Sequence, residues 1–379
     1  NWSFGYNMAD PKVAALKPEE LLSTHNGRRE QAAVTPAQHP VTMGGTEPIG
    51  VGKSWSRASG EPQLDEHDLP VPTYVPWLGK TVEHPEHYGI YFQERWDEAL
   101  ACDPEFLYIN DWNEWTAGKY QPGGEGKTVS WLRRQSPFFF VDQYNAEFNR
   151  CIHPVKGGYT DNYYMQMAQN LRRYKGARPI PRLEGYAEAK ADGDFGEWDA
   201  VTTEYRDTRG DVFHRDAKGY AGLHYVDTSG RNDILTAKVA VGRRAIGFYA
   251  ETADALTPSD GNNWMLLLID ADNDSSTGWY GYDFVINKKV KDGRTTTLMR
   301  YDSDSEQWIE AAELPYRYEG NRLEVIVPRK LLGLTGDGFT FDFKWSDNAY
   351  ELEDPISLCL HGDTAPNRRF NYRCIWNRR

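Results

Sequence analysis

A polar run at the end of an apolar segment holds the residue types best suited to chemistry. Residues 106–109 are apolar and lead directly into Asn110, Asp111, Trp112, Asn113, Glu114 and Trp115. Acidic side chains at the C-terminal end of a strand are where α/β barrels assemble their active sites, so we predict that Glu114 and Asp111 are catalytic. The flanking indole rings would restrict water and raise the pKa of a carboxyl group enough for acid/base chemistry. The alternative is a surface glutamate beside two packing tryptophans.

The same region offers side chains that suit a sugar ring. Aromatic faces stack on the apolar faces of sugars, and amide groups bond sugar hydroxyls. We therefore assign substrate binding to Trp112, Asn113, Trp115, Asn110, His39 and Glu94. For His39 and Glu94 the assignment depends on position alone. A loop histidine bonded to the backbone and a carboxylate on a helix surface are the simpler alternatives.

Residues 112–115, Trp-Asn-Glu-Trp, resemble the Asn-Glu-Trp signature of the barrel glycosidases of glycoside hydrolase families 99 and 71. The resemblance covers about residues 1–176 and implies a barrel that acts on an oligo- or polysaccharide. In the family 99 endo-mannosidases a second catalytic Glu follows the first by three residues, but Ala117 stands there in this chain. The resemblance therefore carries over Glu114 only. Glycosidase chemistry normally needs two carboxylates, so a second one is expected elsewhere.

A second run, residues 266–284, places closely spaced carboxylates after an apolar strand. Asp270, Asp272 and Asp274, together with backbone carbonyl groups, would suit a hard, oxygen-preferring cation such as calcium. An ordinary Asp-rich turn between strands is the alternative. The aromatic residues expected to stack on sugars in this part of the chain are Trp264, Trp279, Tyr280 and Trp308.

This run resembles the family 9 carbohydrate-binding modules, and two further segments strengthen the resemblance. Residues 191–198 resemble the opening Asp-Gly-x-x-x-x-Trp element of those modules, and residues 343–348 resemble their penultimate strand. The resemblance spans about residues 183–379. It implies an antiparallel β-sandwich that binds sugar.

Strands and helices alternate in the segment that must position the first run. Residues 31–35 and 106–111 are predicted strands. Residues 89–101 and 161–174 are predicted helices, because apolar side chains recur there at helical spacing. A parallel barrel needs eight strands and roughly 250 residues, so we expect residues 1–178 to be the C-terminal half of a (β/α)8 TIM-barrel-type domain. A smaller α/β layer is the alternative.

A change of pattern after the last predicted helix indicates a domain boundary. Pro179 and Pro181 interrupt regular structure, so residues 179–182 are the predicted linker and residues 183–379 the second domain. Short strands separated by Gly, Asp and Asn turns predict an antiparallel β-sandwich, which makes the fold class of the whole chain α/β plus all-β. The predicted strands are residues 234–241, 245–250, 264–269, 282–286, 295–301, 322–327, 339–345 and 371–376.

The overall composition excludes some classes of partner. The net charge of −13 and the pI near 5.2 would repel a nucleic-acid backbone, so nucleic acid is not expected as a partner. No stretch approaches the roughly 18 apolar residues of a membrane span. Aromatic residues make up 13% of the chain, which exceeds what packing alone requires and agrees with a sugar ligand.

Neither histidine nor cysteine spacing indicates a transition-metal site. The histidines between His25 and His87 include no His-x-x-x-His pair, and the chain has no Cys-x-x-Cys pair, so we predict no zinc site. The four cysteines permit disulfides. Cys359 and Cys374 lie in short apolar runs and could bridge neighbouring strands, and free buried thiols are the alternative.

Together these observations predict a glycoside hydrolase, or the C-terminal part of one, that is extracellular, periplasmic or attached to the cell surface. No cofactor is expected for catalysis, and calcium is expected only as a structural ion. The alternative is a non-catalytic glycan-binding protein with a degenerate barrel, which Ala117 favours. The expected partners are an oligo- or polysaccharide and the N-terminal half of the barrel, in the same or a separate chain.

Overall fold

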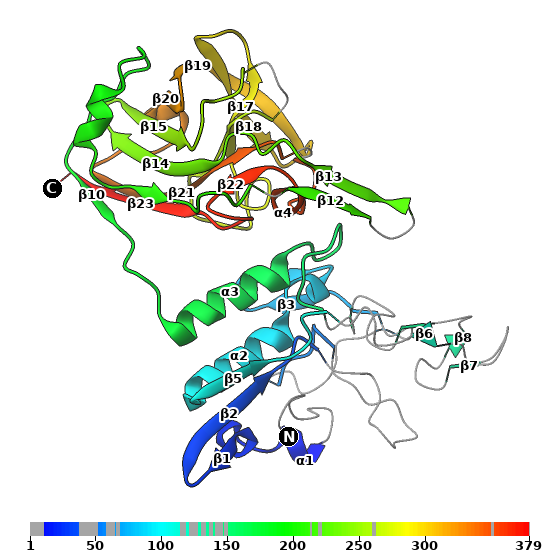
Figure 1. The fold of residues 1–379 in the computed structure, drawn as a ribbon. Helices are drawn as coiled ribbons and strands as arrows, with labels where there is room; N and C mark the ends of the chain where they lie inside the picture. The colour runs from blue at the N-terminus through cyan, green and yellow to red at the C-terminus, as the bar shows by residue number, and fades with distance from the viewer. Residues whose placement is uncertain are drawn as a thin grey trace. The chain divides into compact units, whose positions relative to one another are not determined.

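The computed structural model divides the chain into two compact units, Asn1–Ala177 (unit 1) and Arg178–Arg379 (unit 2). The division falls next to the predicted linker, residues 179–182. Figure 1 traces both units along the chain. The structure describes residues 11–37, 52–57, 65, 69–113, 119–120, 128–129, 134–135, 139–140, 147, 151–212, 214–218, 222–259, 263–349 and 352–378.

A three-stranded sheet, in the order β1-β2-β5, is the framework of unit 1. Strand β2 (Arg28–Val34) pairs antiparallel with β1 (Ser23–His25) and parallel with β5 (Phe106–Ile109). A parallel pair needs a crossover connection, and helix α2 (Ile90–Cys102) lies within it (Figure 1). The described residues of unit 1 thus show a mixed α/β arrangement, and no TIM-type barrel is observed among them.

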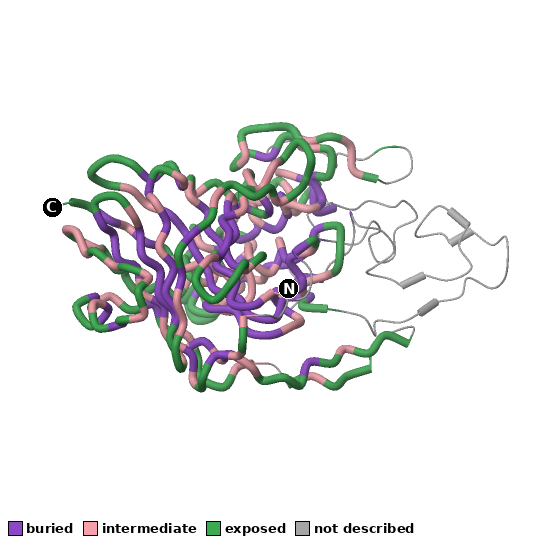
Figure 2. The backbone as a smooth tube through the Cα atoms, turned by 90° about the horizontal axis from the view of Figure 1, so that it is seen from above, coloured by how far each residue is buried: buried purple, intermediate pink, exposed green. Residues whose placement is uncertain are grey.

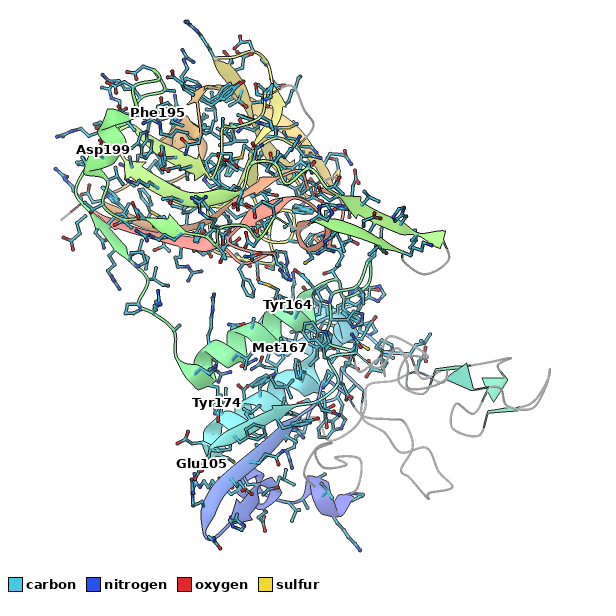
Figure 3. All side chains as sticks on the ribbon, viewed as in Figure 1. Glu105, Tyr164, Met167, Tyr174, Phe195 and Asp199 are labelled. Carbon is cyan, nitrogen blue, oxygen red and sulfur yellow. The ribbon has the colours of Figure 1, made fainter. Side chains whose placement is uncertain are left out.

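Two helices cover this sheet, and both agree with the helical periodicity of the sequence. Helix α2 buries Phe92 and Trp96, and helix α3 (Asn162–Lys175) brings Tyr163 onto them, with the Phe92 and Tyr163 rings stacked 5.9 Å apart. At the other end of α3, the Tyr174 hydroxyl lies 2.9 Å from the carbonyl oxygen of Pro104, just before β5 (Figure 3). The apolar stripe of each helix therefore faces the parallel strand pair.

Unit 1 also contains several short elements. Their bounds are α1 (Pro11–Ala14), η1 (Pro18–Leu21), β3 (Thr73–Val75), β4 (Lys80–Val82), η2 (Pro85–His87), β6 (Lys119–Tyr120), β7 (Thr128–Val129), β8 (Arg134–Gln135) and β9 (Phe139–Phe140).

The main sheet of unit 2 is curled and forms two layers, and β12 and β13 form a separate two-stranded sheet. Strands β11, β14, β15 and β20 make one layer, and β10, β16, β17, β18, β21, β22 and β23 make the other. Strand β19 (Gln307–Glu319) joins them, because it pairs with β18 along its first part and with β20 along its last part. Nearly all of these pairs are antiparallel. The predicted sandwich of short antiparallel strands is therefore present.

The bounds of the unit 2 elements mostly follow the predicted strands. Residues 234–241 form β14 as predicted, whereas the strand predicted at residues 264–269 begins two residues later. The elements are β10 (Arg182–Glu184), η3 (Phe195–Ala200), β11 (Tyr205–Arg206), β12 (Arg215–Lys218), β13 (His224–Asp227), β14 (Ile234–Val241), β15 (Ala245–Thr252), β16 (Leu266–Asp270), β17 (Phe284–Val290), β18 (Thr295–Asp302), β20 (Arg322–Pro328), η5 (Arg329–Leu331), β21 (Gly338–Asp347), α4 (Ser357–Leu360), β22 (Asp363–Ala365) and β23 (Tyr372–Asn377).

The core of unit 2 lies between the two layers. Phe248 and Val325 of one layer meet Leu267 and Phe343 of the other, and the Phe248 and Phe343 ring centroids lie 5.9 Å apart. Figure 2 colours the backbone by burial, with buried residues in purple. Strand β16 is buried on both faces, because Leu268 and its neighbours on the outer face are covered by a second apolar cluster. That explains its unbroken apolar sequence.

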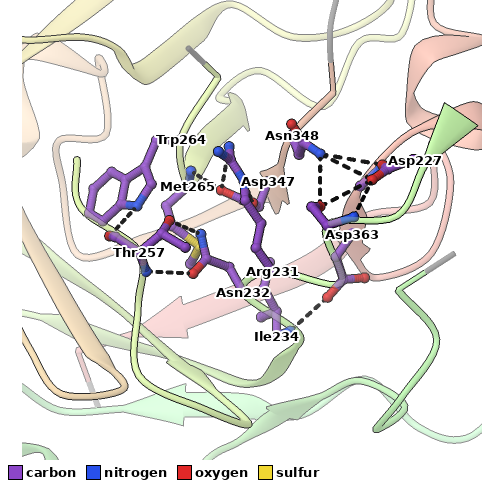
Figure 4. Close-up of polar contacts among 12 residues, drawn as sticks. Asp227, Arg231, Asn232, Ile234, Thr257, Trp264, Met265, Asp347, Asn348 and Asp363 are labelled. Atoms are coloured by element: carbon purple, nitrogen blue, oxygen red, sulfur yellow. Dashed lines mark hydrogen bonds and ion pairs between the residues drawn. The ribbon is translucent and has the colours of Figure 1, made fainter. Parts of the chain in front are cut away.

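A buried polar network fixes the chain that enters β14. Arg231 Nε donates to the Asp347 carboxylate at 2.7 Å, and the Met265 N–H donates to the same carboxylate at 2.9 Å (Figure 4). Asp363 accepts a 2.6 Å hydrogen bond from the Ile234 N–H. Each buried carboxylate thus has donors, which offsets much of the cost of removing it from water.

The structure settles two expectations about the chain as a whole. All four cysteines, Cys102, Cys151, Cys359 and Cys374, are buried and none forms a disulfide, so the suggested bridge between Cys359 and Cys374 is not formed. Among the helices that the structure describes, none is both long and apolar enough to cross a membrane.

Residues 178–379 expressed alone should unfold in one cooperative transition, because the core of unit 2 is drawn from unit 2 residues only. Thermal and urea unfolding followed by near- and far-ultraviolet circular dichroism would measure this.

In the same fragment, Phe343→Ala should lower the unfolding free energy by about 3–5 kcal/mol, because the Phe343 side chain is fully buried. A fragment without cooperative unfolding would contradict the domain boundary.

Candidate functional site

A tight turn between β16 and β17 presents Tyr280 to solvent. Its side chain is 37% exposed, and its backbone has a positive φ of 50°, which is uncommon for a bulky residue. Gly278 permits the turn: a Cβ there would lie 2.3 Å from the Tyr282 carbonyl oxygen. Arg369 donates to the Tyr280 carbonyl oxygen at 3.3 Å and places its guanidinium 5.7 Å from the ring centroid.

A chain of aromatic rings continues from Tyr280 across the outer face of the sheet. The Trp279 ring contacts Tyr280 edge-on, with centroids 5.4 Å apart, and contacts Trp308 at 6.3 Å. Trp308 is partly exposed and lies against Tyr301 at 5.2 Å. We call Tyr280, Trp279, Trp308 and Tyr301 the aromatic row. Its two ends reach solvent, whereas Trp279 in the middle is 4% exposed.

Two of the four predicted sugar-stacking residues are therefore wrong in that role. Trp264 is fully buried in the core, and its indole N–H donates to the Thr257 carbonyl oxygen at 2.9 Å (Figure 4). Trp279 is buried beneath Tyr280, so neither ring has a face free for a ligand. Tyr280 and Trp308 keep accessible surface.

Three carboxylates lie together beside the same turn, although they are not the three that were predicted. Oxygen atoms of Asp270, Asp272 and Asp283 lie within 4.8 Å of one another. Asp274 is not in this group, because its carboxylate accepts hydrogen bonds from the backbone and hydroxyl of Ser276. Asp283 lies immediately before β17, and antiparallel pairing with β16 folds it back onto Asp270.

The electrostatics of this acidic group favour a bound cation. Burial, together with the charges of Asp342, Asp283 and Asp272, raises the pKa of Asp270 to about 7, although a hydrogen bond from the backbone of Asn273 lowers it. Burial also raises the pKa of Asp283. Ionised together, these groups repel one another, and a divalent cation with oxygen ligands would remove that cost.

In unit 1, two of the predicted residues lie at the C-terminal end of β5. Asp111 is 5% exposed, has φ of 65°, and accepts a 2.9 Å hydrogen bond from the Thr35 hydroxyl at the end of β2. Asn110 is also buried, and its backbone N–H donates to the Val34 carbonyl oxygen. The parallel pair thus brings polar groups from two strands to one edge of the sheet. There the Asp111 carboxylate connects the two strands through its hydrogen bond with Thr35.

Two other predicted residues beyond β5 are exposed. Trp112 is 47% exposed, and its ring meets the Tyr164 ring edge-on at 5.8 Å. The His153 ring and backbone lie against the Trp112 carbonyl oxygen, which fixes the chain here. Asn113 is exposed as well. These side chains are accessible to a ligand.

Glu94 has a structural role instead of the predicted substrate contact. Its carboxylate accepts hydrogen bonds from the Ser56 hydroxyl at 3.0 Å and the Arg57 backbone at 2.6 Å, and it contacts Arg95. It therefore anchors the segment 52–57 to α2. Three predicted residues, Glu114, Trp115 and His39, lie outside the described residues.

Sequence reasoning missed several groups around these sites. Arg369 and Asn371 reach the turn from a distant part of the chain, and the Tyr282 hydroxyl lies 2.6 Å from the Asn371 amide oxygen. No local pattern could have identified them, because about ninety residues separate them from the turn. Asp283, in contrast, lay inside the acidic run and could have been chosen by its place immediately before the next strand.

Comparisons with known proteins concern the C-terminal half of the chain. No family model and no curated protein matches. A family 9 carbohydrate-binding module from Caldicellulosiruptor kristjanssonii in complex with cellotriose aligns with 12% identity and a TM-score of 0.27, over 52% of this chain and 95% of that one. A putative carbohydrate-binding protein from Bacteroides uniformis aligns with 10% identity and a TM-score of 0.29, over 52% and 97%.

A structure of the Caldicellulosiruptor module with glucose gives 13% identity and a TM-score of 0.27, over 52% of this chain and 97% of that one. At these values the function of this chain has to be argued from the geometry of its own residues.

Proposed function

We propose that this chain is a glycan-binding protein and that unit 2 binds sugar at two accessible rings of the aromatic row, Tyr280 and Trp308. The observation that carries the proposal is the conformation of Tyr280. A bulky residue at positive φ is held in a costly backbone conformation, and here that conformation turns a partly exposed ring outward. Strain of this kind is concentrated at sites that bind ligands.

The surroundings of Tyr280 supply what a sugar ring needs. Its ring offers a flat apolar face, and the Arg369 guanidinium beside it supplies hydrogen-bond donors for hydroxyl groups. Asn371, bonded to the Tyr282 hydroxyl, adds an amide nearby. Trp308 provides a second accessible ring on the same outer face. Such a site would take a neutral saccharide chain across an open surface.

A saccharide ligand would place the protein where polysaccharides occur, outside the cytoplasm. That location, whether extracellular, periplasmic or at the cell surface, stays a prediction.

Tyr280→Ala and Trp308→Ala should each weaken glycan binding by about tenfold, because an aromatic contact contributes roughly 0.5–1.5 kcal/mol beyond its buried area. Isothermal titration calorimetry on the full chain, with a polysaccharide panel that includes glucose and cellotriose, would measure this. Tyr280→Phe keeps the ring and should retain binding. Ile309→Ala, at a neighbouring exposed side chain of β19, is the control. Equal affinities for all variants would contradict the site.

The acidic group beside the turn extends this proposal. Calcium held by Asp270, Asp272 and Asp283 would fix the connection between β16 and β17, and so the position of Tyr280. The role is structural, and no step of any reaction depends on it.

Calcium should raise the melting temperature of the full chain by roughly 5–10 °C at a hundredfold excess over its Kd, and a chelator should reverse the shift. Asp283→Asn should abolish the effect, since the amide removes one of the three charges. Asp304→Asn, at an exposed carboxylate outside the group, is the matched control. A melting temperature that ignores both calcium and chelator would remove the ion from the proposal.

A second candidate function, hydrolysis of a glycosidic bond, is favoured by the parallel pair in unit 1. Strands β2 and β5 bring Thr35 and Asp111 to one edge, and the exposed Trp112 follows directly. Carboxyl ends of parallel strands are the usual place for catalytic groups in α/β folds. In this candidate Glu114 acts as the acid/base or nucleophile. Asp111, buried and bonded to Thr35, acts as a positioning residue.

Under this second candidate, Glu114→Gln should lower kcat on the bound glycan by at least about a hundredfold, because the amide cannot exchange a proton or act as a nucleophile. Glycan affinity should not change. Release of reducing ends would be followed for the full chain together with any N-terminal segment it requires. Glu105→Gln, at the residue immediately before β5, is the control. Unchanged turnover would remove Glu114 from the mechanism.

A further inference from the structure

Three metal-ligating side chains meet in a part of unit 1 that no proposal above uses. His84, Glu86 and His87 lie at the short helical turn η2, and ligand atoms of all three lie within 4.8 Å of one another. We propose that they form a binding site for a first-row divalent cation of the zinc type. The inference is independent of glycan binding.

The distances around the Glu86 carboxylate suit such an ion. Glu86 Oε1 lies 3.2 Å from His84 Nδ1 and 3.6 Å from His87 Nε2. In a tetrahedral site with metal–ligand bonds of about 2.0–2.1 Å, two ligand atoms lie about 3.3 Å apart. The two distances from Glu86 Oε1 to the histidine nitrogens are close to this value. The two imidazole rings are stacked 5.1 Å apart. Rotation of the solvent-facing His84 ring would bring its ligand nitrogen closer to that of His87.

The carboxylate is buried, and in the part of the chain that the structure describes its nearest side-chain partners are the two histidine rings. The Glu86 side chain is 6% exposed, and among the described residues no hydrogen bond reaches its Oε2 atom. Within the same described ranges, no lysine or arginine forms an ion pair with it; the fully buried Lys53 acts on it only at longer range. A buried carboxylate without such compensation is costly, and a bound cation would provide the compensation.

The backbone around the three ligands is held in place by α3. The Tyr163 hydroxyl donates to the Glu86 carbonyl oxygen at 2.7 Å, and the Asn162 amide donates to the His87 carbonyl oxygen at 3.3 Å. The carbonyl of His84 is bonded by the His87 N–H, which closes the turn. The site is therefore positioned by a rigid helix before any ion binds.

The chemical types of the three ligands indicate which ions would bind. Their exposure to solvent indicates that one coordination position stays open. Two imidazole nitrogens and one carboxylate oxygen suit Zn²⁺, Co²⁺ or Ni²⁺ better than Ca²⁺. Gly158 lies beside the His87 ring, and a Cβ there would be in ordinary contact with Nε2 at 3.9 Å. With His84 68% exposed, solvent reaches the site. Three protein ligands then leave one position for water.

The sequence conceals this site because the histidines are three residues apart instead of four. A His-x-x-x-His pair places two rings on one face of an α-helix, whereas η2 is a tighter 3-10 turn with about three residues per turn. In such a turn residues i and i+3 align, which brings His84 and His87 together.

The test is binding of Zn²⁺ and Co²⁺ to the full chain without an affinity tag. Equilibrium dialysis should give one Zn²⁺ per chain, and Co²⁺ should give the visible absorption bands of a four-coordinate site. Glu86→Gln, His84→Ala and His87→Ala should each weaken Zn²⁺ binding by at least about tenfold. His25→Ala, at an exposed histidine of β1, should leave it unchanged.

His84→Ala keeps the inference testable if buried variants misfold, because this side chain is mostly in solvent and its loss should leave the metal-free melting temperature unchanged. Zn²⁺ affinity that is the same in His84→Ala and His87→Ala as in the parent chain would overturn the site, as would binding lost equally in His25→Ala. Glycan binding measured on the same variants should not change.

Discussion

Strand β19 runs from one layer of unit 2 into the other. The architecture of unit 2 depends on this shared strand. Residues Gln307–Pro315 pair with β18, and Tyr316–Glu319 pair with β20, so one strand belongs to both layers. Leu314 and Tyr316 are buried where it crosses. Because the sheet folds on itself here, the inner faces of both layers enclose one core, and their outer faces need separate cover.

The residues that cover one outer face of the sheet also form the candidate sugar site. Leu266 and Leu268 point away from the main core, and Trp279 and Tyr282 from the next turn bury them. Trp279 is used for packing, and the following residue, Tyr280, is 37% exposed. The same turn thus covers a strand that is apolar on both faces and presents the exposed ring. Stability and the proposed sugar binding depend on the same turn.

Unit 1 depends on polar groups that are removed from water. Lys53 is fully buried, with its amine 3.9 Å from the Tyr159 ring centroid and 4.1 Å from that of Tyr163. Burial lowers the pKa of Lys53 to about 7 and raises the pKa of Glu147 to about 7. The buried Glu147 carboxylate accepts a hydrogen bond from Ser54, and the partly buried Glu94 carboxylate accepts one from Ser56, so the two carboxylates hold the segment 52–57 in place.

The sequence by itself determined α2, α3, most strands of unit 2 and the acidic run after β16. These features can be recognised locally, because repeating apolar positions are a property of neighbouring residues. Only the tertiary structure decided which side chains meet. Strand β19 was missed because it carries Pro315 and several glutamates, and its pairing with two partners overrides weak local preference. Asp283 replaces Asp274, and Trp279 is buried, because strand pairing and packing bring together residues that spacing along the chain does not relate.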